Sequence, residues 1–216
     1  MRMNVILLGA GLSKRMGRQK LLLPFGDRSV IETVIGNLRD AGARMIYAVL
    51  SREVADALGP AAGPLTVRVN EEPERGQSSS LSIGLDMLPA GEDFCIMLGD
   101  LPLARAADIA ALAERFKALP PEKSVLAPCR GGAFGHPMFY RALWRERFRG
   151  AEGDVGGKKI LMRYEGEIER AEAPDCHFKD MDTPEEYQER LAVNRRKSAF
   201  IRAVCVITCP LSVLAV

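Results

Sequence analysis

Four basic side chains follow a short glycine-containing turn near the start of the chain, and this combination could bind phosphate. The turn is Gly9-Ala10-Gly11, and the basic residues after it are Lys14, Arg15, Arg18 and Lys20. Small residues in a turn let backbone N–H groups approach an anion, and basic side chains add charge-assisted hydrogen bonds. The segment therefore favours a polyphosphate ligand, although a run of basic residues is more often a solvated surface.

Two common phosphate-binding motifs do not fit this segment. A Walker loop requires the spacing G-x-x-x-x-G-K-[ST], which is not present here. The dinucleotide-binding turn G-x-G-x-x-G is matched by Gly9 and Gly11, but Lys14 stands where the third glycine should be. An oxidoreductase that binds a nicotinamide dinucleotide is therefore a weaker alternative.

Carboxylates occur at two further places where they could meet the same ligand. Asp100 follows the apolar run 94–98, and Asp180 and Asp182 precede Thr183-Pro184. An aspartate at the carboxyl end of a parallel strand faces the crevice in which α/β proteins bind ligands. Mg²⁺ binds through one or two carboxylates together with substrate phosphate oxygens. A simple Asx turn would explain Asp100 equally well on its own, and the nearby basic loop favours the metal.

Alternating strand and helix patterns predict the elements that position these groups. The alternation predicts a three-layer α/β/α fold with a mostly parallel sheet. We expect strands over 5–8, 45–50, 65–69, 94–98, 125–127 and 168–171, and helices over 30–38, 54–58, 81–88, 104–119 and from 184 onward. Ser29 with Glu32 forms a capping box before the first helix, and Thr183 with Glu186 forms one before the last. Ser78 and its neighbouring serines are expected to cap the third helix.

Composition places the chain among ordinary globular proteins. It has 216 residues, of which 47% are hydrophobic and 27% charged, with a net charge of +2. One α/β domain accounts for this length, and the weak net charge argues against nucleic acid and membrane surfaces as partners. The five cysteines are an odd number without a C-x-x-C pair, which argues against a disulfide framework and a zinc knuckle and favours the cytoplasm.

The order of residues around the basic loop resembles the signature loop of the MobA-like NTP transferases, L-x-A-G-x-S-x-R-M-G-x-x-K. The matching residues are Leu8, Ala10, Gly11, Ser13, Arg15, Met16, Gly17 and Lys20. Gly9 and Lys14 depart from the usual residues of that loop. Further similar segments are G-Q-S-S-S-L, G-D-x-P, G-H-P, G-D-x-G-G-[RK] and D-[IM]-D-T-P, so that the resemblance covers roughly residues 5–191.

The resemblance implies a role for each matching residue. It implies nucleotide binding by Leu8, Gly9, Ala10, Gly11, Ser13, Arg15, Lys20, Gln77 and Ser78. It implies catalysis by Arg15, Lys20 and Asp100, with Mg²⁺ held by Asp100 and Asp182. It implies that the acceptor is bound by His136, Pro137, Asp154 and Lys158.

The implied reaction is transfer of CMP from CTP to the terminal phosphate of molybdopterin, with release of pyrophosphate and delivery of the product to a molybdoenzyme. Ala10 in place of a second glycine favours CTP over GTP, because its methyl group narrows the space for a purine. The alternatives are GTP, another phosphorylated acceptor, or a non-catalytic carrier of the molybdenum cofactor. We expect the transferase domain to span residues 1–193, followed by a tail of unknown role over 194–216.

Overall fold

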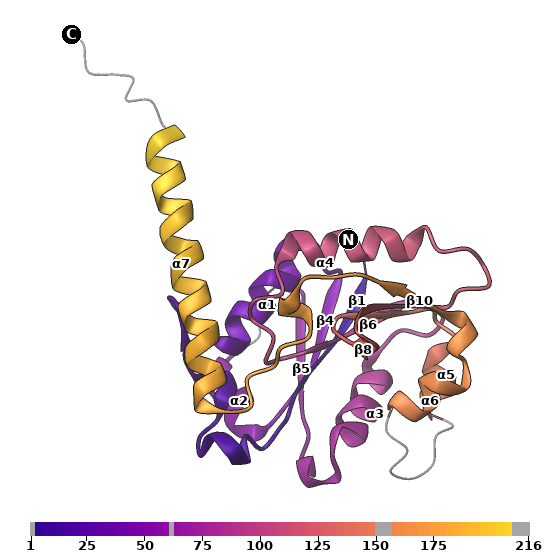
Figure 1. Cartoon of the computed structure of the whole chain (residues 1–216). Helices are drawn as coiled ribbons and strands as arrows, with labels where there is room; N and C mark the ends of the chain where they lie inside the picture. The colour runs from indigo at the N-terminus through magenta and orange to yellow at the C-terminus, as the bar shows by residue number, and fades with distance from the viewer. Residues whose placement is uncertain (1–2, 61–62, 150–156, 209–216) are drawn as a thin grey trace.

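The chain folds as a central sheet covered by helices on both faces, in three layers (Figure 1). The computed structural model describes residues 3–60, 63–149 and 157–208, with the backbone alone for residues 158 and 197–208. In these ranges eight strands join into one sheet, in the order β10-β7-β9-β6-β1-β4-β5 with β8 paired to β7. The strands are β1 (Asn4–Gly9), β4 (Met45–Leu50), β5 (Leu65–Val69), β6 (Phe94–Leu98), β7 (Val125–Arg130), β8 (Ala133–Phe134), β9 (Met138–Tyr140) and β10 (Ile168–Ala171).

The sheet is mostly parallel, as predicted. Strand β1 lies at its centre and pairs in parallel with β4 on one side and β6 on the other. Strand β9 is the exception that the sequence did not reveal, because it runs antiparallel between β6 and β7. The carboxyl ends of β1 and β6 therefore meet where the strand order reverses, which is the usual ligand position in such folds.

Helices cover the two faces of the sheet and build two separate cores. Alternate residues of a strand point to opposite faces, so Val5 and Leu7 of β1 are buried in one core and Ile6 in the other. The first core contains residues of α1, α2 and α4, and the second contains residues of α3, α5 and α6. The bounds are α1 (Val30–Asp40), α2 (Arg52–Leu58), α3 (Gln77–Met87), α4 (Ala106–Lys117), α5 (Trp144–Arg149) and α6 (Gly157–Arg163).

Several short elements connect these layers. A hairpin of β2 and β3 precedes α1, and single turns of 3₁₀ helix punctuate the loops. Their bounds are β2 (Pro24–Phe25), β3 (Arg28–Ser29), η1 (Lys14–Met16), η2 (Lys20–Leu22), η3 (Pro73–Arg75), η4 (Glu165–Glu167) and η5 (Asp175–His177).

Capping explains where two of the helices begin. The Ser29 hydroxyl accepts from the N–H of Glu32, whose carboxylate accepts from the N–H of Ser29, so the predicted capping box before α1 is confirmed. Thr183 and Glu186 make the same exchange at the start of α7 (Pro184–Thr208). The expectation that serines cap α3 is wrong, because the N-cap residue is Gly76 and no side chain caps this helix.

The last helix crosses the predicted end of the domain. α7 runs without a break from residue 184 to residue 208 and extends beyond the body of the molecule (Figure 1). Residues 194–208 are therefore helical, and a division of the chain at residue 193 remains a prediction. Within the part of the chain that the structure describes, no helix is both long and apolar enough to cross a membrane.

Candidate active site

The glycine turn at the end of β1, Gly9-Ala10-Gly11, lines a pocket of about 360 Å³. Gly9 is needed for packing, because a Cβ at this position would lie 2.7 Å from Leu50 and 3.0 Å from Leu21. Gly11 differs, because a Cβ there would meet no atom of the described structure within 4 Å. The backbone at Gly11 therefore borders open space that a ligand can occupy.

Ser13 holds the basic loop in shape. It is the one described non-glycine residue with a positive φ, 48°, a conformation that costs energy and persists only when neighbours enforce it. Its hydroxyl donates to Gln19 at 3.0 Å and accepts from the backbone N–H of Lys20 at 3.2 Å. Gln19, which the sequence analysis did not single out, also accepts from the N–H of Leu21 at 3.4 Å. These bonds fix the path of the chain from the turn to Lys20.

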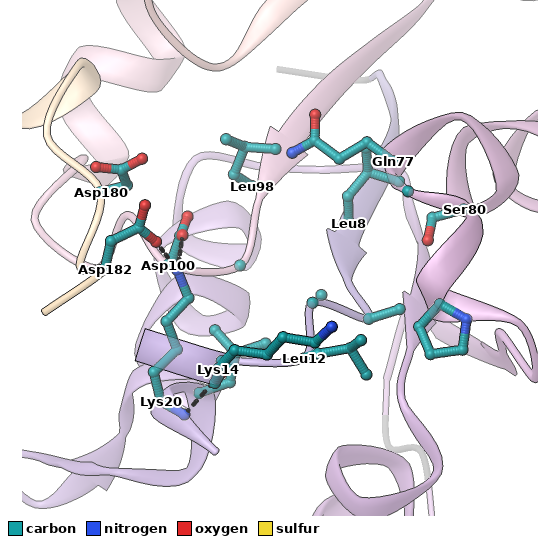
Figure 2. Close-up of a pocket in the computed structure, with 18 of the residues that line it drawn as sticks. Leu8, Leu12, Lys14, Lys20, Gln77, Ser80, Leu98, Asp100, Asp180 and Asp182 are labelled. Atoms are coloured by element: carbon teal, nitrogen blue, oxygen red, sulfur yellow. Dashed lines mark hydrogen bonds and ion pairs between the residues drawn. The ribbon is translucent and has the colours of Figure 1, made fainter. Parts of the chain in front are cut away.

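Three carboxylates converge on one side of this pocket (Figure 2). Asp100 follows β6, and Asp180 and Asp182 lie in the segment before α7. One oxygen from each of the three lies within 4.8 Å of the others. The sequence predicted Asp100 and Asp182 as metal ligands and pointed to Asp180 as a carboxylate approaching the same place, without assigning it as a ligand.

Lys20 joins two of these carboxylates. Its ammonium lies 2.5 Å from an Asp100 oxygen and 2.7 Å from an Asp182 oxygen, and Arg15 makes an ion pair with the second oxygen of Asp182. Burial disfavours the ammonium form of Lys20, but attraction and hydrogen bonds to the two carboxylates outweigh it and raise its pKa. Lys20 is therefore charged at neutral pH.

The two later carboxylates have opposite electrostatic surroundings. Burial would raise the pKa of Asp182, but hydrogen bonds and attraction from Lys20 and Arg15 outweigh it and lower this pKa. The pKa of Asp180 is raised, first by burial and then by repulsion from Asp182 and Asp100. The cluster thus holds more negative charge than Lys20 balances.

Asp100 shows that the cluster fits a cation. Its Oδ1 atom is buried and has no hydrogen-bond partner among the described residues. A buried carboxylate oxygen without a partner is costly, and a divalent cation satisfies it. Oxygen donors alone are the ligand set of Mg²⁺ and similar hard cations. The residues at this position therefore fit a divalent metal.

The opposite wall of the pocket comes from η3 and the start of α3 (Figure 2). Gln77 and Ser80 line the pocket there, facing Leu8 and Leu98 at the strand ends. Ser78 was expected to do so, but within the described structure it is exposed, outside the lining, and its hydroxyl donates to the carbonyl of Arg75 at 3.4 Å. Residues three positions apart share one face of a helix, so Gln77 and Ser80 both face the pocket and Ser78 lies on a different face.

The residues predicted to bind the acceptor are either outside the described pocket lining or outside the described part of the chain. His136 and Pro137 are outside the lining that the structure describes; Pro137 is buried, and His136 Nδ1 contacts the carbonyl of Ile96 at 3.2 Å. Burial lowers the pKa of His136, while the Ile96 carbonyl and Asp100 partly oppose this shift. Asp154 lies outside the described residues, as does the side chain of Lys158.

Comparison with known families identifies the fold and its chemistry. The family model of the MobA-like NTP transferase domain matches residues 5–168, which include the glycine turn, Lys20 and Asp100. This chain belongs to the MobA-like NTP transferase family. It is accordingly a nucleotidyltransferase that takes a nucleoside triphosphate as substrate. The match ends before Asp180 and Asp182, so their place beside Asp100 comes from the structure.

Several known proteins are similar to this chain in sequence or in fold. The chain is 27% identical over 194 residues to the purine catabolism protein PucB of Bacillus subtilis, covering 84% of this chain and 92% of PucB. Rv0371c of Mycobacterium tuberculosis superposes with a TM-score of 0.75 at 25% identity, covering 89% of this chain and 98% of Rv0371c. A structure of Rv0371c in complex with manganese gives a TM-score of 0.71 at 22% identity, over 89% and 99% of the two chains. The nucleotidyl transferase Mth528 of Methanothermobacter has a TM-score of 0.76 at 20% identity, over 91% and 99%.

Proposed function

We propose that this transferase moves CMP from CTP to the terminal phosphate of molybdopterin and releases pyrophosphate. The observation that carries the proposal is the position of Lys20 between Asp100 and Asp182, at the edge of a pocket floored by the glycine turn. This arrangement offers backbone groups and cations to a triphosphate and carboxylates to the cation that accompanies it.

The basic residues would act on the phosphates. Arg15 is 69% exposed and can turn from Asp182 towards a bound triphosphate. Lys20 would exchange its carboxylate contacts for contacts with the phosphates of a bound triphosphate. Both residues then stabilise the negative charge that develops on the leaving pyrophosphate. The attacking phosphate is already anionic at neutral pH, so positioning and charge neutralisation suffice, with no general base.

The carboxylates would hold Mg²⁺. Asp100 and Asp182 are the proposed ligands, Asp180 adds a third oxygen donor within reach, and the unpaired Oδ1 of Asp100 supports a cation here. The manganese complex of Rv0371c agrees with divalent metal at this fold. When bound, the ion supplies Lewis-acid polarisation of the α-phosphate.

Ala10 supports the choice of CTP. It lines the pocket and is 4% exposed, so it is held among packed neighbours at the pocket wall. A smaller pyrimidine fits beside it more easily than a purine. We therefore expect Ala10→Gly to increase use of GTP relative to CTP.

The residues proposed to bind the acceptor lie outside the described pocket lining or outside the described residues. Assignment of the acceptor to His136, Pro137, Asp154 and Lys158 remains a prediction, as do transfer of the product to a molybdoenzyme and a cytoplasmic location. His136 bonds to Ile96 rather than lining the pocket, so contact with the acceptor requires the second substrate to approach from that side. A different phosphorylated acceptor, and a carrier role without turnover, are the remaining alternatives.

The test is pyrophosphate release from CTP or GTP, with Mg²⁺ and with molybdopterin or its molybdate-bound form as acceptor. The proposal expects release with CTP and acceptor together. Release with GTP alone would refute the base assignment and keep the reaction. Binding of the acceptor without release from either nucleotide would refute the transferase proposal and support a carrier.

Matched variants separate site chemistry from general charge. Lys20→Gln and Asp100→Asn should each lower kcat/KM by about 100-fold or more, as expected when a preorganised charge is removed. Arg18→Gln is the control, because Arg18 belongs to the same basic loop but is exposed and lies outside the described pocket lining. An equal loss in Arg18→Gln would show that overall loop charge, and not this cluster, carries the activity.

A further inference from the structure

A second group of potential ligands lies away from the pocket, between α4 and η5. Asp108 lies in the first turn of α4, and Cys176 and His177 are consecutive residues of η5. A carboxylate oxygen, the thiol sulfur and a ring nitrogen from these residues lie within 4.8 Å of one another. Asp108 is distant in sequence from the adjacent residues Cys176 and His177, and only the fold brings it to them.

His177 has an unused ring nitrogen at this place. Its side chain is completely buried, and its Nδ1 lies 2.7 Å from the carbonyl oxygen of His136. Because a carbonyl oxygen only accepts, Nδ1 carries the hydrogen and Nε2 keeps a lone pair. Nε2 is buried and has no hydrogen-bond partner in the described residues. A backbone carbonyl on one ring nitrogen is the usual way in which a metal-binding histidine is oriented.

The surroundings leave room for an ion. His177 and Asp108 line a pocket of about 210 Å³, which Glu172 and Arg115 also border. Arg115 pairs with Glu169 at 2.7 Å, so its charge is already balanced. Burial lowers the pKa of His177, while the His136 carbonyl and Asp108 partly oppose this shift.

We propose that Asp108, Cys176 and His177 bind a single Zn²⁺ ion, with the fourth position open to Glu172 or water. Mixed sulfur, nitrogen and oxygen donors are the ligand set that Zn²⁺ takes in proteins, whereas the all-oxygen cluster at Asp100 suits Mg²⁺. Ligand atoms around tetrahedral zinc lie roughly 3.5 Å apart, which is compatible with three donor atoms that all lie within 4.8 Å of one another. The side chains of Asp108 and Cys176 are half-buried.

Zinc at this position would stabilise the chain segment that runs from η5 to Asp180 and Asp182. η5 is pinned to the neighbouring segment, because the N–H of His136 donates to the carbonyl of His177 at 2.9 Å and a Cβ at Gly135 would lie 2.5 Å from the same oxygen. Asp180 follows three residues after His177. The ion would thus tie α4 to the segment that delivers Asp180 and Asp182, without contacting the substrate.

The test uses cobalt as a spectroscopic substitute for zinc. The full-length protein is stripped of metal with a chelator, supplied with excess Mg²⁺ to occupy the carboxylate cluster, and titrated with Co²⁺. We expect one Co²⁺ per chain to produce a thiolate-to-cobalt charge-transfer band that Zn²⁺ abolishes. Carboxylates alone cannot produce this band, so the active-site cluster does not interfere.

Variants assign the band to its ligands. Cys176→Ser should abolish it, and Asp108→Asn should weaken cobalt affinity at least about tenfold without disturbing a buried group. The matched controls Cys129→Ser, Cys205→Ser and Cys209→Ser should keep it. Absence of a thiolate band in the wild type would overturn the proposal and leave a water-filled pocket. A band that survives in Cys176→Ser would also overturn it.

Discussion

Replacing Lys20 by methionine should destabilise the metal-free protein by a measurable amount. Lys20 is the cation shared by Asp100 and Asp182, with contacts of 2.5 and 2.7 Å. Methionine keeps the length and apolar character of the side chain, so the change removes the charge with little loss of packing. Two carboxylates then remain close together beside Asp180 without their common partner.

The size of the effect follows from the exposure of the partners. Removing one member of a buried ion pair costs about 3–5 kcal/mol, whereas an exposed pair contributes about 0–1 kcal/mol. Lys20 and Asp100 are 12% and 13% exposed and Asp182 is 26% exposed, so the site lies between these limits. We expect the free energy of unfolding to fall by about 2 kcal/mol, which lowers Tm by about 4–8 °C for a chain of this size.

The pH dependence of the loss has a definite sign. The pKa of Lys20 is raised above its ordinary 10.5, so its contribution to stability is complete below that value and is lost as the pH rises through the folded pKa. The pKa of Asp182 is lowered below 3.8, so its contribution is complete above that value and is lost as the pH falls through the folded pKa. The Tm difference between wild type and variant should therefore be constant between these limits and shrink at both ends.

Thermal unfolding with and without Mg²⁺ measures this prediction. Mg²⁺ must compete with the Lys20 ammonium in the wild type but not in Lys20→Met, so it should raise Tm more in the variant. Lys14→Met is the control, because Lys14 lines the same pocket but is exposed, and its Tm should change by about 1 °C or less. A Tm of Lys20→Met within about 1 °C of the wild type, or an equal Mg²⁺ effect in both proteins, would refute the reasoning.

Three further predictions concern neighbouring positions. Asp180→Asn should raise the Tm of the metal-free protein by about 1–3 °C, because it removes a carboxylate that Asp182 and Asp100 repel. The same variant should bind Mg²⁺ more weakly, as measured by calorimetry, and a lower Tm would contradict the prediction. Gly9→Ala should lower Tm, because its Cβ would lie 2.7 Å from Leu50. Gly11→Ala should leave Tm unchanged and weaken nucleotide binding, because a Cβ there would meet no protein atom within 4 Å in the described structure. The reverse pattern would show that Gly11 is needed for packing and Gly9 for nucleotide binding. Glu186→Ala removes the acceptor for two backbone N–H groups at the start of α7 and should reduce chemical-denaturation stability by about 0.5–2 kcal/mol, and an unchanged midpoint would show that the cap is redundant.

Local patterns were sufficient for most of the fold. Strands β4, β5 and β6 were predicted with the bounds that the structure has. β4 and β6 are short continuous apolar segments between polar turns, as is typical of buried parallel strands, whereas β5 at the edge of the sheet alternates in polarity. The capping boxes before α1 and α7 were equally visible, since each depends on two residues three positions apart. Strand β9 was missed, because its three residues are too few for a pattern and its place between β6 and β7 is set by long-range pairing.

The candidate site divides in the same way. The glycine turn and the basic residues from Gly9 to Lys20 were enough to predict a polyphosphate ligand, because the chemistry of a loop is carried by neighbouring residues, and the resemblance of this loop to the MobA-like signature implied a nucleotidyltransferase. Ser80 lies in the pocket lining and Ser78 does not, which depends on where α3 begins. Asp180 lies beside Asp100 and Asp182 because of the path of the segment before α7. The meeting of Asp108 with Cys176 and His177 is likewise a product of helix packing. Sequence spacing reports only what lies along the chain, whereas convergence of distant side chains is decided by burial of the two cores on either side of the sheet.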